Sequence, residues 1–234
     1  MNHGEFDSAS KAGVYQAIHS RRDVRKHFVG GEIPAGVLAR VLNAAHHAPS
    51  VGFMQPWNFM LIRDAKIRGE ICQAFQRANL EAVEMISPDR REKYRQLKLE
   101  GILESSLNIC VTCDRERTGS VGLGRTAQIN MDLFSTVCAV QNLWIAARAE
   151  GLGVGWVSII HQADLRRILN IPEVIEPVAY LCIGPVSEFP TKPDLEVAEW
   201  LPRLDLPDLV YCDQWGNPSV QAWPALHREL TPHK

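Results

Sequence analysis

The segment 130–150 carries apolar side chains around nearly its whole circumference, and this feature strongly restricts the folds open to the chain. Its spacing predicts a long helix, and a helix that is apolar on every side has to be covered on every side. Its apolar residues are Met131, Leu133, Phe134, Val137, Val140, Leu143, Trp144 and Ala147. We therefore expect this helix to be buried within a domain or shared between two subunits.

Shorter patterns predict the remaining elements. Apolar runs of strand length occur at 57–62, 107–113, 154–160 and 178–183. Helical patterns occur at 14–22, from Pro34 to Pro49, at 65–85, from Ser87 onward and at 162–169, and a charged loop is expected at 115–125. After Pro185, repeated prolines and scattered tryptophans predict an extended arm. Because tryptophans are costly to leave in water, we expect the arm to wrap another surface, such as a partner subunit.

The balance of charge argues against several classes of protein. The 234 residues contain 25 Lys and Arg against 27 Asp and Glu, so no overall basic field attracts nucleic acid or an anionic membrane. No apolar run approaches the roughly 20 residues of a membrane helix. Residues 1–11 lack the apolar stretch of a secretory signal. We expect a cytoplasmic globular protein.

Neither the cysteines nor the histidines predict a metal site. Cys110 and Cys113 lie three apart in a predicted strand, so their side chains face opposite sides of the sheet. His46 and His47 are adjacent and diverge by about 100° on a helix. We expect buried structural cysteines and no metal.

Residues 20–26 bring together four cations and one carboxylate. At helical spacing Arg21 and Arg25 share a face, and two guanidinium groups can hold one phosphate. We expect Asp23 to be a carboxylate among these cations. A solvated helix face explains the same charges, so this segment alone leaves both interpretations open.

Residues 48–57 read Ala-Pro-Ser-Val-Gly-Phe-Met-Gln-Pro-Trp and predict a rigid loop between a helix and a strand. The loop offers Ser50 and Gln55 as ligands. Its apolar tip favours a pocket or an interface, because loops rarely expose three apolar residues together. A plain connector has the same composition.

Three glycines, Gly151, Gly153 and Gly155, precede Trp156 and Ser158. A dinucleotide fingerprint requires a strand, a glycine turn and a helix in that order, whereas here a helix precedes and a strand follows. A helix C-cap explains Gly151 and is an alternative for Gly153, but it does not explain Gly155. The others allow the backbone to approach something flat, with Trp156 and Ser158 on one face of the strand.

Together the three segments resemble the nitroreductase-like FMN-binding family. That family has an arginine-rich N-terminal motif, a P-S-x-x-N-x-Q-P-W loop and a late G-L-G-x-x-W turn; this chain has Phe53 at the asparagine position of the loop. The likeness covers about 14–216, leaving a tail over 1–13 and an extension over 217–234. It implies an α+β, three-layer fold with a mixed, mainly antiparallel sheet between helices, an extended C-terminal arm, and a homodimer with flavins at the subunit interface.

Further residues resemble one group within the family, whose members consume FMN. These residues are 21–25, 50–57, 98–101, 109–114 and 155–158. The resemblance implies that reduced FMN is the substrate and that O₂ is the co-substrate. The products would be 5,6-dimethylbenzimidazole, the lower ligand of vitamin B12, and erythrose 4-phosphate. NAD(P)H would act only through a separate flavin reductase.

The resemblance also implies roles for single residues. Asp23 and Ser158 are the candidate catalytic residues, because they correspond to polar groups near the reacting flavin. The segment 87–104 is a candidate lid. The residues expected to bind the flavin are Arg21, Arg22, Asp23, Val24, Arg25, Ser50, Met54, Gln55, Gly155, Ser158 and Arg203, with Ser50 reaching it across the dimer.

Two other functions are weighed against this one. The first is an NAD(P)H-dependent nitroreductase or flavin reductase with bound FMN, which NADPH would bleach directly. The second is a flavin-binding or structural dimer without catalysis, in which Asp23→Asn and Ser158→Ala would change nothing beyond affinity.

Overall fold

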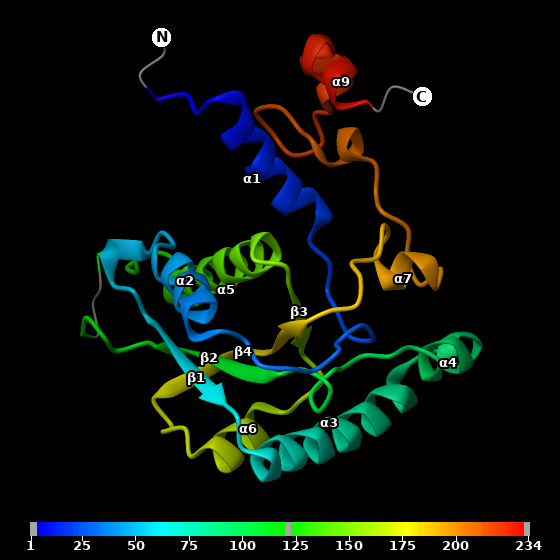
Figure 1. Ribbon diagram of the computed structural model, residues 1–234. Helices are drawn as coiled ribbons and strands as arrows, with labels where there is room; N and C mark the ends of the chain where they lie inside the picture. Colours follow the sequence, from blue (N-terminus) through cyan, green and yellow to red (C-terminus); the bar gives the residue numbers. More distant parts are fainter. Residues whose placement is uncertain (1–3, 120–122, 232–234) are drawn as a thin grey trace. The chain divides into compact units, whose positions relative to one another are not determined.

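The computed structural model describes residues 4–119 and 123–231 (Figure 1). They form two compact units, one up to Pro193 and one from Asp194 onward. Residues 1–3, 120–122 and 232–234, which fall in the predicted tail, charged loop and extension, lie outside the described residues. The limits at 14 and 216, which mark the extent of the motif likeness, stay a prediction.

A four-stranded sheet forms the middle of the first unit. The strand order is β1 (Trp57–Ile62), β2 (Leu107–Asp114), β4 (Ile175–Pro185) and β3 (Leu152–Val157), and all neighbours are antiparallel. In the described residues the parallel component of the predicted mixed sheet is the isolated bridge between Asp23 and Val154.

Helices cover both faces of the sheet, which confirms the predicted three-layer α+β fold (Figure 1). α2 (Ala35–His46) and α5 (Met131–Ala149) pack on one face, and α3 (Ala65–Met85) and α6 (Gln162–Leu169) pack on the other. Each layer encloses its own hydrophobic core, because side chains of the two central strands alternate between the faces.

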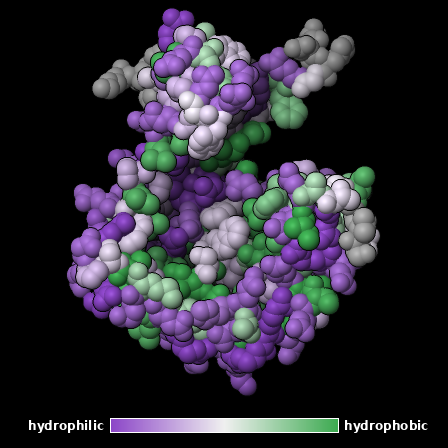
Figure 2. All heavy atoms as spheres, turned by 180° about the vertical axis from the view of Figure 1, so that it is seen from behind, coloured by the Kyte–Doolittle hydropathy of each residue, from purple (hydrophilic) through white to green (hydrophobic). Residues whose placement is uncertain are grey.

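α5 is buried along most of its length but leaves part of its first half open. Ala139, Leu143 and Ala147 are fully buried, whereas Phe134 and Val137 are 54% and 40% exposed. Figure 2 shows hydrophobic patches on an otherwise hydrophilic surface. The helix is therefore both buried in its own domain and open to a further apolar surface.

The predicted bounds of β1, α3 and α6 are confirmed, and others shift for local reasons. α1 (Ser8–Ser20) begins six residues before the predicted start, because Asp7 accepts a hydrogen bond from the Ser10 N–H at 2.9 Å. β3 ends at Val157, the last residue that pairs with β4, and not at residue 160 as predicted.

Cys110 and Cys113 face opposite sides of the sheet, as predicted. Cys110 lies in the core under α3, and burial raises the pKa of its thiol to about 12. Cys113 lies on the α5 side, where Thr136 is a hydrogen-bonding neighbour. Both are free thiols.

The predicted lid segment begins with α4 (Pro88–Arg95), which packs on α3. The buried Tyr94 donates its hydroxyl proton to Asn79 Oδ1 at 2.7 Å. The Arg68 guanidinium donates to the carbonyl oxygens of Ile102, Leu103 and Ser105. The segment is thus attached to the rest of the unit through Tyr94 in α4 and through the carbonyl groups at its C-terminal end.

The second unit contains α7 (Asp194–Val197), the 3₁₀ helix η2 (Leu206–Leu209), α8 (Ser219–Ala222) and α9 (Pro224–Leu230), joined by extended chain. Prolines here start helices as well as interrupt them, because a first-turn residue needs no N–H. Trp215 is 90% exposed and contacts Tyr211 in a tilted arrangement, with ring centroids 4.7 Å apart. No helix in the described part of the chain has the length and apolarity to cross a membrane.

Candidate functional site

The arginine-rich segment is extended and is not helical. α1 ends at Ser20, and the Val24 N–H then donates to the Val154 carbonyl of β3 at 3.0 Å. The prediction that Arg21 and Arg25 share a helical face is therefore wrong. An isolated bridge to β3 anchors the segment at Asp23 and Val24.

Arg21 and Arg22 contact other parts of the first unit. The Arg21 guanidinium lies 4.8 Å from the centroid of the Trp144 ring on α5, a cation–π contact. The Arg22 guanidinium donates to the carbonyl of His19 at 2.8 Å and to that of Thr191. These contacts fix the segment between α1, α5 and the chain that follows β4.

Asp23 and Arg25 form an ion pair beside β3. Asp23 Oδ2 accepts a hydrogen bond from Arg25, and its Oδ1 accepts one from the Trp156 N–H at 3.1 Å. The Nε atoms of Arg22 and Arg25 are buried and have no hydrogen-bond partner among the described residues. Two guanidinium donors without partners suit the acceptor oxygens of a polar ligand.

Gly153 and Gly155 of β3 leave room for the close approach of Val186 and Val24. A Cβ atom on Gly155 would lie 2.1 Å from the Val24 carbonyl oxygen, and one on Gly153 would lie 2.4 Å from Val186. The interpretation that they admit something flat needs correction, because the chain itself occupies that space. Gly151 has a φ of +78° after α5, as expected of a helix C-cap.

Gly155→Ala is expected to lower the free energy of unfolding by about 1–3 kcal/mol, because the added methyl group meets a backbone oxygen that cannot turn away. Thermal unfolding measures the change. Gly69→Ala is the control: its Cβ would meet nothing within 4 Å on α3, and we expect stabilisation by about 0.5–1 kcal/mol. Equal stability of the two variants would contradict this account.

Ser158 follows the last residue of β3 and its side chain is exposed. Together with Trp156 and Val157 it borders a hollow of about 220 Å³. Residue 158 lies two positions beyond the N–H that binds Asp23, which is about 7 Å along an extended chain. The structure therefore brings Asp23, Arg25, Gly155 and Ser158 into one region.

The Ser50–Gln55 loop contains the 3₁₀ turn η1 (Val51–Phe53). Ser50 Oγ accepts a hydrogen bond from the Gln55 N–H at 3.1 Å, and the Val51 N–H donates to Ser135 Oγ of α5 at 3.0 Å. Met54 is buried, whereas Phe53 is 82% exposed. The loop is ordered by its own contacts and presents one apolar ring to solvent.

The structure does not bring this loop to the arginine segment within one chain. The loop contacts Ser135 on α5, whereas the arginine segment contacts Trp144, nine residues later and about 14 Å along the helix. Arg203, the remaining residue that was expected to bind the flavin, belongs to the second unit. It precedes η2 in the sequence and is exposed.

A buried cluster of charged side chains lies at the start of α5 and was not predicted from the sequence. Asp132 is fully buried, and its carboxylate pairs with Arg115 at 3.0 Å and with Arg125 at 2.9 Å. Burial by itself would lower the pKa of the Arg115 guanidinium, but the hydrogen bonds and charge of Asp132 raise it above its ordinary value. The charged loop predicted at 115–125 is thus partly internal.

No group of three His, Cys, Asp or Glu residues in the described ranges is arranged to hold a metal ion.

Comparisons with known proteins connect the chain to flavoenzymes. A model described as the Nitroreductase family matches residues 18–185. A Rhodospirillum rubrum protein named 5,6-dimethylbenzimidazole synthase is 40% identical over 203 residues, covering 86% of this chain and 95% of the relative. A Rhodobacter capsulatus protein of the same name is 35% identical over 200 residues, covering 85% and 96%.

Solved structures share the fold. Iodotyrosine deiodinase, bound to FMN and 3-iodo-L-tyrosine, gives a TM-score of 0.67 at 19% identity, covering 86% of this chain and 98% of that one. The NADPH:FMN oxidoreductase of Vibrio harveyi, complexed with NAD⁺, gives 0.65 at 17% identity, covering 93% and 86%. At these identities the likeness shows the fold alone.

Proposed function

This chain belongs to the nitroreductase family, and we propose that it forms 5,6-dimethylbenzimidazole from reduced FMN and O₂, with erythrose 4-phosphate as the second product. The observation that carries the proposal is the 40% identity to the Rhodospirillum synthase across 95% of that protein. The chain is accordingly an oxidoreductase, and its flavin is the substrate. NAD(P)H acts only through a separate flavin reductase that supplies reduced FMN.

The arginine segment fits the polar half of FMN. The buried Nε atoms of Arg22 and Arg25 are donors that still need partners, and Arg21 lies beside them along the chain. We assign these three arginines to the phosphate and the ribityl chain. Backbone groups of Val24 and Gly155 line the same place, and Arg203 is a further candidate. When bound, FMN supplies a reduced ring system that reacts with O₂.

Asp23 and Ser158 supply the proton-handling groups. Asp23 has both carboxylate oxygens engaged, one by the Trp156 N–H and one by Arg25, so its orientation is fixed. An oriented carboxylate acts as a proton acceptor or holds the substrate in place. The exposed Ser158 hydroxyl both donates and accepts a hydrogen bond. Together they move protons at the flavin ring and at the first ribityl carbon.

A homodimer completes the site. Within one chain the Ser50–Gln55 loop lies too far along α5 to join the arginine segment, so we assign Ser50, Met54 and Gln55 to the flavin bound by the partner subunit. Apolar side chains support the contact, since Phe53, Leu123 and Phe134 are all more than half exposed. The second unit wraps a partner in this proposal.

The segment 87–104 serves as the lid over the flavin. Glu92 and Arg95 of α4 are exposed, whereas Glu100 is largely buried and pairs with Lys98. Gly101 brings the segment against the Arg25 carbonyl, where a Cβ atom would lie 3.1 Å from the oxygen. A cover at this point excludes water from the reacting groups.

The test is aerobic incubation of the purified protein with FMN, NADH and a separate flavin reductase, followed by mass spectrometry of the small molecules. We expect 5,6-dimethylbenzimidazole, and we expect it to vanish when O₂ is removed. Intact FMN, with NADH consumed equally fast when the reductase is omitted, would overturn the proposal and identify an NAD(P)H-dependent nitroreductase.

A further inference from the structure

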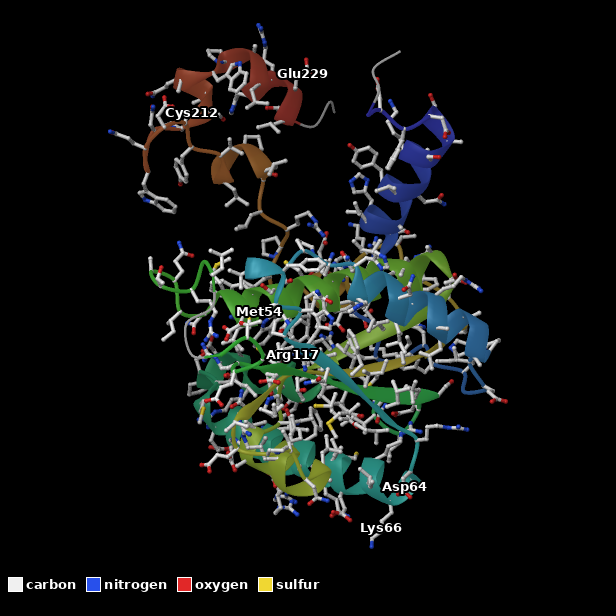
Figure 3. The ribbon with its side chains drawn as sticks, turned by 90° about the vertical axis from the view of Figure 1, so that its left-hand side faces the viewer. Met54, Asp64, Lys66, Arg117, Cys212 and Glu229 are labelled. Carbon is white, nitrogen blue, oxygen red and sulfur yellow. The ribbon has the colours of Figure 1, made fainter. Side chains whose placement is uncertain are left out.

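Three consecutive carbonyl groups, those of Gln55, Pro56 and Trp57, accept hydrogen bonds from the last residue of β2 and from Arg117 shortly after it. The Asp114 N–H donates to the Pro56 oxygen at 2.7 Å. Arg117 Nη1 donates to the oxygens of Gln55 and Trp57 at 2.5 and 2.9 Å. A single guanidinium therefore holds both ends of the turn that closes the Ser50–Gln55 loop, close to Met54 (Figure 3).

The remaining nitrogens of Arg117 are engaged as well. Nη2 donates to Asn58 Oδ1, and Nε lies 3.5 Å from Asp114 Oδ2. Asn58 in turn donates to Thr112 Oγ1 at 3.2 Å. A lysine ammonium is a point charge on a flexible stem and cannot reproduce this planar fork.

The loop that Arg117 holds has an unfavourable backbone. Phe53 and Gln55 have φ values of +55° and +47°. Residues other than glycine rarely adopt this region of backbone conformation. Such a conformation persists only where its surroundings enforce it. Gln55 is held by Ser50 Oγ at its N–H and by Arg117 at its carbonyl.

We propose that Arg117 is a positioning residue of the flavin site, which keeps Ser50, Met54 and Gln55 in the conformation that contacts FMN. This inference rests on the proposed function, because it takes the loop to contact the flavin. Loss of the fork releases the Gln55 carbonyl, and the loop relaxes towards ordinary backbone angles. The contacts of Ser50 then change although Ser50 itself is intact.

The experiment compares Arg117→Ala and Arg117→Lys with the control Arg166→Ala. Arg166 also donates to a carbonyl, that of Pro172 at 2.7 Å, but it lies on α6. FMN affinity is measured by quenching of flavin fluorescence. We expect both Arg117 variants to weaken binding about 10- to 100-fold, and the control to stay within about twofold of wild type. We also expect faster amide exchange at Gln55, and partial rescue of Arg117→Ala by added guanidinium ion.

Unchanged FMN affinity in both Arg117 variants would overturn the inference, as would equal weakening in Arg166→Ala. Where Arg117→Ala fails to fold, Arg117→Lys decides, because it keeps the charge and the aliphatic stem. The two proposals fail separately. A wild-type protein that binds FMN without forming the benzimidazole refutes the proposed reaction, and the affinities still decide the role of Arg117.

Discussion

Asp23→Asn is expected to lower kcat for 5,6-dimethylbenzimidazole formation by about 10²- to 10⁴-fold, the usual contribution of a positioned proton-transfer group. An asparagine retains one oxygen for the Trp156 N–H but loses the negative charge and the proton-accepting oxygen beside Arg25. The protein should stay folded, because the backbone pairing of Val24 with Val154 does not involve the side chain.

The rate is measured by mass spectrometry in the presence of saturating reduced FMN and O₂. Asp164→Asn is a matched control, since Asp164 also pairs with arginines, Arg77 at 3.1 Å and Arg167 at 2.9 Å, but lies on α6. The hydrogen bond from Arg167 lowers the pKa of the Asp164 carboxyl, yet no proton transfer is assigned to it. A rate in Asp23→Asn equal to that of the control would remove Asp23 from the catalytic groups.

Asp132→Ala is expected to lower the free energy of unfolding by about 3–5 kcal/mol, because it leaves two guanidinium groups without their buried partner. For a chain of this size the melting temperature should fall by about 6–20 °C. Asp132 also accepts a hydrogen bond from the Leu133 N–H at 2.9 Å, so the first turn of α5 loses a partner too.

Thermal unfolding followed by circular dichroism checks this, with Asp164→Ala as the control. That carboxylate forms its ion pairs at the surface, where such pairs contribute about 1 kcal/mol or less. Equal melting temperatures of Asp132→Ala and Asp164→Ala would show that the cluster at the start of α5 stabilises the protein no more than surface ion pairs do.

The elements with strong local patterns were predictable and the long-range contacts were not. α3 has helical periodicity over its full length, and β1 is a short apolar run, so both follow from neighbouring residues. The cations at 21–25 also match a helical pattern, but they lie in extended chain because β3, far along the sequence, offers the carbonyl of Val154. A local sequence pattern does not show that a strand far along the chain will pair with the segment in place of a helix.

The candidate site divides in the same way. Asp23, Arg25 and Ser158 were predicted because they belong to motifs, and the structure supplies the contacts that orient Asp23. Arg117 and Asp132 lie outside the motifs. Their importance comes from burial and from partners on other elements, which composition and spacing do not encode.

The hydrogen bond between Asp23 and the Trp156 N–H joins residues 133 positions apart. During synthesis from the N-terminus, the arginine segment therefore leaves the ribosome long before its strand partner exists. Closing so long a loop carries a large entropic cost, and contacts of this kind form late. A nascent chain that stops before β3 has the arginine segment without the Val154 carbonyl and the Trp156 N–H that hold it in the folded protein. Because β3 takes its place in the sheet by pairing with β4, the Asp23 carboxylate acquires its orientation only once residues up to 185 have been synthesised.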